Sequence, residues 1–312
     1  MNKNTTVSAS LSQGEVQELL NGAQPGDRFI FEPGTYRISL VVNARGTADS
    51  PIILEANEPG TVTLTGADRI QGWQPEGENW VKGIDLTHLP ASADHGILDG
   101  RREQIFIDGQ PLRQVLHKDQ LKGGCFCYDE AAGKLLMRPH VFAGEIRGGS
   151  LDVDKGAIQG GGTASVDRED PMHNWQFLLE AFNPEDHVVE VTTRSRIFSL
   201  AGDYRDPDEG SAHIVVRGFN FRASGDAPQK AMVHIGGRYQ TVEDCRFEYG
   251  AARGFDMRCH DSVVRKSVSR LNGQLGFSGY GADNLVEDCL LQHNNTKHST
   301  FVCFEQGGCK IV

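Results

Sequence analysis

The chain repeats itself with a step of 22 residues in its last third. Three hexapeptides align without gaps at this spacing: Val242–Phe247, Val264–Ser269 and Val286–Leu291. The same step of 22 residues joins Phe255 to Phe277 and Asn272 to Asn294. A fixed period of this length is typical of solenoids, in which each repeat packs on its neighbours.

The residues within each repeat favour β-strands. Val, Phe and Cys stand in short runs between Gly, Asn and Asp, which is the composition of strands and turns. The frame of leucine-rich repeats and a helical period of about 3.6 residues are both absent. Val216–Phe221 fits an earlier coil with a four-residue insertion, and Ile311-Val312 would begin the next coil. We therefore expect an all-β solenoid whose coils stack about 4.8 Å apart.

Stacking of the coils places residues 22 apart in one column. Opposite charges alternate along two such columns and are expected to attract across adjacent strands: Glu243, Arg265 and Glu287, and Asp244, Lys266 and Asp288. Cys245 and Cys289 would lie two coils apart, about 9–10 Å, which is too far for a disulfide bond. The seven cysteines are therefore expected to be free thiols, which fits a reducing compartment.

Charge and composition argue against several classes of partner. The net charge of −11 disfavours nucleic acid, because binding its backbone requires clustered Lys and Arg. Residues 213–270 nevertheless hold ten Lys or Arg against six Asp or Glu, a local +4 that would attract an anionic polymer. No apolar run reaches the roughly 18–20 residues of a membrane span. The first ten residues lack the apolar core of a secretory signal, which on that basis predicts a cytoplasmic protein.

The N-terminal part predicts a capping helix followed by strands. Ser12 and Glu15 have the spacing of a capping box before a helix over 15–21. Gly and Pro turns separate the strands that we expect at 29–31, 40–42, 52–54 and 62–64. The run Ala23–Tyr36, with its Pro25-Gly26-Asp27 and Pro33-Gly34 turns, resembles the opening of pectin-lyase-like β-helix proteins. This resemblance covers about residues 14–66 and 213–312, and it implies a right-handed parallel β-helix.

Three parts follow from this interpretation. Residues 1–66 form the cap and first coils, residues 67–212 a β-rich insertion packed on the solenoid, and residues 213–312 the regular coils. Within the insertion, Asp108-Gly109 predicts a hairpin turn, and further strands are expected at 125–128, 134–137, 188–192 and 197–200. No polar cap follows the last coil, so we expect an incomplete C-terminus or self-association through the open coil.

Strand alternation predicts which residues of neighbouring coils face outward. Ile235 and Met257 align with inward positions, so their neighbours along the strands point away from the core. These neighbours form two columns: His234, Asp256 and Ser278, and Gly236, Arg258 and Tyr280. An imidazole, a carboxylate, a guanidinium and a phenol would then lie within about 10 Å of one another.

The outward cluster suits elimination from a uronic acid. Arg258 would pair with the substrate carboxylate, while His234 and Tyr280 would transfer protons beside Asp256. If the cluster is ordinary surface, Arg258 instead pairs with Asp256. Four further side chains are expected to bind substrate: Arg238, Arg253, Trp73 and Trp80.

A second resemblance concerns the coil that contains Arg258. Val242–Asp261, with its Phe-x-Met-Arg-x-His-Asp ending, resembles the catalytic coil of the chondroitinase B and alginate lyase family. On this resemblance Arg258 matches the family's catalytic arginine, and the family's lysine falls near Gly237 or Arg238. The family's acidic calcium ligands are replaced here by Ala231-Met232-Val233. We therefore expect no metal and no cofactor, calcium being implied only by the family.

These observations together predict a carbohydrate-active β-helix protein that cleaves an acidic polysaccharide or oligosaccharide by β-elimination. A glycoside hydrolase is one alternative; it needs two carboxylates, for which Asp256 with Asp261 or Glu305 is available. A non-catalytic β-helix that binds glycan or serves as a structural stem is the other. Relatives of this type are often secreted, so the resemblance and the absence of a signal point to different locations.

Overall fold

The computed structural model describes residues 3–90, 98–139, 182–297 and 307–312. They form two compact units, one of residues 1–67 and 193–312 and the other of residues 68–192. The insertion therefore ends near residue 192 and not at 212. Strand β16 (Phe198–Leu200), expected within the insertion, pairs instead with solenoid strands on both sides. Its alternating pattern explains this placement, because Phe198 and Leu200 are buried in the solenoid core.

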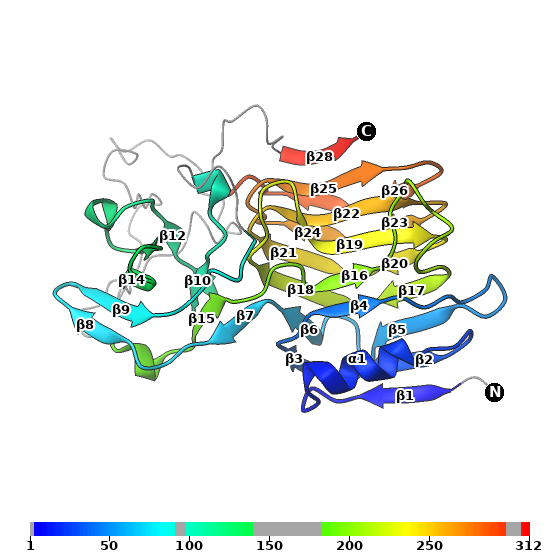
Figure 1. Ribbon diagram of the computed structural model, residues 1–312, viewed down its shortest axis with the longest axis horizontal. Coiled ribbons are helices and arrows are strands. Elements are labelled where there is room, and N and C mark those ends of the chain that lie inside the picture. Colours follow the sequence, from blue (N-terminus) through cyan, green and yellow to red (C-terminus); the bar gives the residue numbers. More distant parts are fainter. Residues whose placement is uncertain (1–2, 91–97, 140–181, 298–306) are drawn as a thin grey trace. The chain divides into compact units, whose positions relative to one another are not determined.

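The first unit is a solenoid of parallel strands, stacked in successive coils (Figure 1). Its described strands form three sheets. The first sheet contains β1 (Asn4–Val7), β2 (Arg28–Phe31), β5 (Ile52–Ala56), β17 (Ile214–Arg217), β20 (Thr241–Glu243), β23 (Val263–Arg265) and β26 (Leu285–Glu287). The second contains β4 (Leu40–Val42), β16, β19 (Ala231–Arg238), β22 (Arg253–His260), β25 (Leu275–Tyr280) and β28 (Gly307–Ile311). The third contains β3 (Gly34–Tyr36), β6 (Val62–Thr65), β18 (Phe219–Ser224), β21 (Arg246–Gly250), β24 (Val268–Arg270) and β27 (Leu290–Gln292).

The register of the coils confirms the 22-residue step. Val264 pairs with Val242 on one side and with Val286 on the other. Val216 pairs with Val242, as expected for a coil that carries a four-residue insertion. The expectation for Ile311 is wrong: it pairs with Gly279, because residues 307–311 bond to β25 in the second sheet and not to β26 in the first.

The solenoid interior is a column of apolar side chains, many of them aromatic. Phe221 stacks on Phe247 with ring centroids 5.4 Å apart, and Phe255 stacks on Phe277 at 5.0 Å. Such rings align because equivalent inward positions of successive coils lie one strand spacing apart. Cys245 is buried in the same core, as predicted for a small apolar residue.

Opposite charges line the outer face of the first sheet. Arg265 contacts Glu243 at 2.7 Å, which confirms the predicted attraction between adjacent coils. The alternation extends to earlier coils, where Arg217 lies 3.9 Å from Glu243 and 2.6 Å from Glu55. These pairs are partly exposed, so they add little to stability and mainly favour one register over another.

Helix α1 (Gln13–Asn21) begins with the predicted capping box. The Glu15 amide donates to the Ser12 hydroxyl, and the Glu15 carboxylate accepts from the Ser12 amide. Val16 and Leu20 are buried in the solenoid core. The helix also covers the edge of β4, as predicted for a cap, because the Gln17 side chain accepts from the Val41 amide and donates to its carbonyl.

The second unit is built from two sheets around a core of its own. One contains β7 (Ala67–Arg69), β10 (Ile105–Ile107), β11 (Gln110–Pro111) and β15 (Val189–Thr192). The other contains β8 (Gln74–Glu76), β9 (Asn79–Gly83), β12 (Arg113–Gln114), β13 (Cys125–Asp129) and β14 (Lys134–Arg138). The predicted hairpin is present as β10–β11, and the strands expected at 125–128 and 134–137 pair with each other as a second hairpin, β13–β14. The Asp108-Gly109 turn of the first has positive φ at both positions, which Asp and Gly tolerate.

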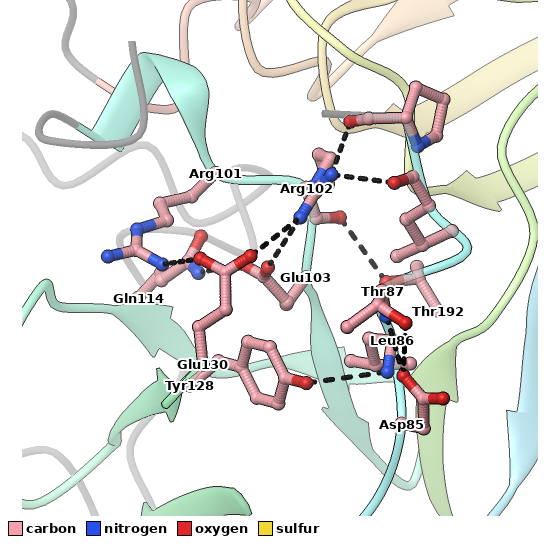
Figure 2. A network of polar contacts seen from close by, with 12 residues as sticks. Asp85, Leu86, Thr87, Arg101, Arg102, Glu103, Gln114, Tyr128, Glu130 and Thr192 are labelled. Atoms are coloured by element: carbon pink, nitrogen blue, oxygen red, sulfur yellow. Dashed lines mark hydrogen bonds and ion pairs between the residues drawn. The ribbon is translucent and has the colours of Figure 1, made fainter. Parts of the chain in front are cut away.

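A buried charge network lies inside the second unit (Figure 2). Arg102 and Glu103 are each 1% exposed. The Arg102 guanidinium donates to the carbonyls of Leu89 and Pro90 and lies 3.9 Å from Glu103. Removing one member of such a pair would leave the other charge buried without compensation, so the network favours one arrangement of these loops.

Some expected features lie at or beyond the described residues. In the described part of the chain, no helix is long and apolar enough to cross a membrane. Leu285, Leu290 and Ile311, on β26, β27 and β28, are 47–75% exposed. One of the seven cysteines, Cys303, and the expected hydrolase carboxylate Glu305 lie outside the described residues.

Candidate functional site

The second sheet carries the two predicted columns of side chains. His234 pairs with Asp256 and Asp256 with Ser278, while Arg258 lies between Gly236 and Tyr280. The residues that alternate with them, such as Ile235 and Met257, are in the core. The columns therefore face away from the solenoid interior, as predicted. The same pairing adds Ser199 before His234 and Lys310 after Ser278, two positions that the sequence pattern did not reveal.

The column of His234, Asp256 and Ser278 is buried, contrary to the expectation of an open surface. These side chains belong to residues that are 8%, 3% and 0% exposed, respectively. His234 Nδ1 lies 2.7 Å from Asp256 Oδ1, and His234 Nε2 lies 3.0 Å from the Gly202 carbonyl oxygen. Both ring nitrogens are thus engaged, and in this arrangement neither can take a proton from a substrate.

The other column is accessible and centres on Arg258. Its guanidinium carbon lies 4.9 Å from the Tyr204 ring and 4.8 Å from the Tyr280 ring. The two rings stack on each other with centroids 5.7 Å apart. Arginine packs well against aromatic faces because the ring quadrupole attracts the planar cation. The guanidinium is therefore held flat and in place, with about a quarter of the side chain exposed.

Arg258 pairs with Asp203 and not with Asp256, the partner expected if the cluster were ordinary surface. Arg258 Nε donates to Asp203 Oδ2 at 2.7 Å. Burial acts to raise the pKa of Asp203, but the hydrogen bonds from Arg258 and the Arg205 amide, together with the charges of both arginines, outweigh it and the pKa is lowered. Burial likewise acts to lower the pKa of Arg258, and the Asp203 carboxylate reverses this and raises it. Both groups are charged across the ordinary pH range, so the pair is ionic.

The loop over residues 201–210 supplies the partners that sequence analysis missed. Besides Asp203 and Tyr204, it holds Asp208, which accepts from Arg238 at 2.8 Å. His260 Nε2 also lies 2.9 Å from the Tyr204 carbonyl oxygen. This loop has no counterpart in the regular coils. Phe198–Leu200 pairs with Val233–Ile235, which places the start of the loop at the end of a solenoid strand.

The predicted substrate-binding residues have separate environments. Arg238 donates to both Asp208 and Asp261, which raises its pKa, and lies over the Tyr239 ring at 5.0 Å. Arg253 is 2% exposed and donates to the Ser278 hydroxyl at 2.8 Å. Its burial is contrary to a role in binding substrate at an open surface.

The two tryptophans belong to the second unit. Trp73 is 3% exposed, and its indole nitrogen donates to the Ile70 carbonyl, so the expectation of an exposed ring is wrong. The ring is buried because it packs into the core between the two sheets of that unit. Trp80 is half-buried and meets Phe182 edge-on at 6.4 Å.

A second carboxyl group, that of Asp226, lies close enough to Asp256 for their charges to interact. Asp226 is 1% exposed and accepts a hydrogen bond from the Ser224 hydroxyl. Burial raises the pKa of Asp226 to about 6, and the charge of Asp256 contributes in the same direction. Asp261, the partner expected for Asp256 in a hydrolase, is bound to Arg238 instead. Among the described residues, no three His, Cys, Asp or Glu side chains form a group that could hold a metal ion.

Comparisons with known proteins agree with the solenoid fold. The family model described as chondroitinase B matches residues 10–74, about a fifth of the chain. No curated protein matches the sequence. The structure of XylC in complex with xylose is similar at a TM-score of 0.67 and 12% identity, over 95% of this chain and 54% of that one. This chain thus spans about half the length of XylC.

Two further solved structures show weaker similarity. A glycoside hydrolase matches with a TM-score of 0.48 and 13% identity, over 89% of this chain and 67% of that one. A PL6 family polysaccharide lyase from Pseudopedobacter saltans matches with a TM-score of 0.40 and 10% identity, over 90% and 36%. At these identities the likeness concerns the fold. The chain is a right-handed parallel β-helix protein with a short N-terminal capping helix and a β-rich insertion.

Proposed function

We propose that this chain is a carbohydrate-active protein that binds an acidic polysaccharide at Arg258 and cleaves it by β-elimination. The observation that carries the proposal is the arrangement of the Arg258 guanidinium. Asp203 and two tyrosine rings fix its orientation through Nε and through its flat face. Within the described residues, no hydrogen bond engages its two Nη atoms, which are the atoms that grip a carboxylate in a bidentate pair.

A uronic acid presents the groups that this surface suits. Its carboxylate would accept from both Nη atoms of Arg258, and its apolar ring face would pack on Tyr280 or Tyr204. The surrounding strands add positive charge, because residues 213–270 carry a net +4. The family model that matches residues 10–74 is that of a polysaccharide-degrading family, which favours the same class of substrate.

The reaction requires charge stabilisation and proton transfer. When the proton leaves the α-carbon, Arg258 stabilises the negative charge that develops on the carboxylate. The Tyr280 hydroxyl lies beside Arg258 and relays this proton: its oxygen takes up the α-proton as it passes its own hydroxyl proton to solvent. The electron pair of the broken C–H bond forms the α,β double bond, the C–O bond at the β-carbon breaks, and the leaving oxygen takes up a proton from solvent. His234 has no part in the transfer, because both of its nitrogens are engaged.

A panel of uronic-acid and neutral polysaccharides tests this reaction. Cleavage by elimination yields an unsaturated product, detected by its ultraviolet absorbance, from acidic polymers only. Arg258→Lys keeps the charge but loses the bidentate geometry, so turnover should fall roughly 10²-fold. Arg270→Lys is a matched control, because Arg270 is similarly buried and bonds through Nε at 2.7 Å to Glu248 on the third sheet. Equal turnover of the two variants would contradict the assignment.

Hydrolysis of a glycosidic bond is the second candidate, and Asp226 favours it. A glycosidase uses one carboxylic acid that stays protonated and one carboxylate that stays ionised. Burial raises the pKa of Asp226 to about 6, which suits the acid, and Asp256 is the second carboxyl group that interacts with it. New reducing ends without an unsaturated product, lost in Asp226→Asn, would support hydrolysis. Binding that depends on Arg258 but yields no product at any pH would indicate a non-catalytic protein.

A further inference from the structure

The loop over residues 201–210 packs closely against β19 at three glycines, one in the loop and two in the strand. A Cβ added to Gly236 would lie 2.2 Å from the Gly202 oxygen, and one added to Gly202 would lie 2.5 Å from the Gly237 nitrogen. Gly202 and Gly237 also have φ of 122° and 71°, a region that favours glycine. The sequence thus lets the loop backbone approach the strand closely, and this approach brings the Gly202 carbonyl to His234.

His234 is placed between two groups that can only accept hydrogen bonds. The Asp256 carboxylate faces Nδ1 at 2.7 Å, and the Gly202 carbonyl faces Nε2 at 3.0 Å. A neutral imidazole carries one N–H and can satisfy only one of them, whereas the imidazolium donates to both. The arrangement is therefore complete only when the ring is cationic, with Asp256 as its counter-ion.

The charged groups near this pair act on it through Asp256. Asp226 and Arg258 each interact electrostatically with the Asp256 carboxylate. Two more polar groups share its column on the neighbouring strands, namely Ser199 on β16 and Ser278 on β25, the latter bonded to Arg253. None of these groups offers a second acceptor to His234, so its two contacts determine which protonation state fits.

Gly202 immediately precedes the two residues that orient Arg258. Asp203 accepts from Arg258 Nε at 2.7 Å, and the Tyr204 ring lies 4.9 Å from the guanidinium carbon. We propose that His234 is a positioning residue whose cationic form holds Gly202, and thereby Asp203 and Tyr204, in the geometry that fixes Arg258. Loss of the ring proton to solvent removes one of the two hydrogen bonds and loosens the loop. This regulation rests on the proposed carboxylate site at Arg258.

Binding of a galacturonic acid tetrasaccharide, measured by calorimetry across the pH range, tests the proposal. As the rising pH removes the ring proton, affinity should fall roughly tenfold in the unmodified chain. His234→Gln cannot become cationic, so its affinity should be low and independent of pH. Asp256→Asn removes the counter-ion, so the fall should move to lower pH. A merely structural role for the pair would weaken binding without moving this midpoint.

His260→Gln is the matched comparison. His260 lies one coil further on and contacts the same loop, but through the single Tyr204 carbonyl, which a neutral imidazole can satisfy. This variant should weaken binding at every pH and keep the fall with pH seen in the unmodified chain. A pH dependence that survives in His234→Gln, or that vanishes in His260→Gln, would overturn the assignment to His234.

A measurement without ligand separates this proposal from the proposed function. The N–H signal of Arg258 Nε reports its hydrogen bond to Asp203 and can be followed by nuclear magnetic resonance. It should shift and broaden with rising pH over the same range in which affinity falls in the unmodified chain, and stay unchanged in His234→Gln. If the signal shifts with pH in this way but the tetrasaccharide does not bind, the carboxylate site at Arg258 is rejected and the positioning role of His234 is supported. A signal that is constant with pH in the unmodified chain would reject the positioning role of His234.

Discussion

Asp226 is a carboxyl group that the solenoid encloses almost completely. Burial raises its pKa to about 6, above the ordinary value of 3.8 for an aspartate. Because the folded state binds the proton more tightly than the unfolded state, the free energy of unfolding falls as the pH rises from about 4 to about 6. Asp226→Asn should therefore stabilise the protein at pH 7, by up to about 3 kcal/mol, and have little effect below pH 4.

Urea unfolding of both proteins at several pH values provides the measurement. The Ser224 hydroxyl retains an acceptor in the variant, because an asparagine carbonyl replaces the carboxyl oxygen. Asp261→Asn is a suitable comparison: this carboxylate is partly exposed and bound to Arg238, so the variant should lose stability at pH 7. If the free energies of unfolding of Asp226→Asn and the unmodified chain differ by the same amount at every pH, burial does not raise the pKa of Asp226 and the prediction is wrong.

Asn272 is the residue on which one corner of the solenoid depends. It is fully buried, its Oδ1 accepts from the Gly250 amide at 2.8 Å, and its Nδ2 donates to Asn294 Oδ1 at 2.9 Å. Asn272→Ala would leave these buried groups without partners and should lower the free energy of unfolding by about 3 kcal/mol. Asn294→Ala, at a half-buried position that water can reach, should cost about 1 kcal/mol. Equal costs in chemical denaturation would contradict this account.

At the scale of elements, helix α1 acts as a substitute for a missing strand. The Gln17 side chain makes both hydrogen bonds that a neighbouring strand would make to Val41. Gln17→Ala should lower the free energy of unfolding by about 1 kcal/mol, since water replaces part of the loss at this half-exposed edge. It should also promote association, because the edge of β4 becomes available for pairing. Light scattering and urea unfolding would show both effects; Glu18→Ala, at an exposed position on the helix, should show neither.

The elements that could be predicted from the sequence are those whose partners lie at a fixed distance along the chain. Val264 stacks on Val242 and Arg258 on Gly236 because each coil repeats the last, so a single spacing determined the register. The same logic placed His234, Asp256 and Ser278 in one column.

The remaining features depend on contacts that have no period. The loop that carries Asp203 and Tyr204 comes from an irregular segment, so nothing in the 22-residue step indicated that it would bury His234 or hold Arg258. The burial of Trp73 depends on how two sheets of the second unit pack, which its neighbours in sequence do not determine. Pairing within the repeat was predictable, whereas exposure was not.

At the scale of the whole molecule, the second unit leaves and rejoins the solenoid at one point. The Gly66 carbonyl accepts from the amides of Thr193 and Arg194 at 2.8 and 3.0 Å, so the two ends of the insertion are adjacent. Arg194 in turn accepts from the Gly225 amide, which fixes this junction to the following coil. An insertion of this kind closes a long loop between neighbouring points and leaves the pairing of the solenoid strands unaffected.

Deleting residues 68–192 and joining Ala67 to Thr193 through about three glycines should therefore leave the solenoid folded. The shortened chain should keep parallel-strand circular dichroism and a cooperative thermal transition, because both apolar cores are separate. Its affinity for a uronic-acid oligosaccharide should stay within about twofold of the full chain, since Arg258 and all of its described partners belong to the first unit. A folded product that no longer binds would place part of the binding surface in residues 68–192, and an aggregated product would show that the solenoid needs the insertion to fold.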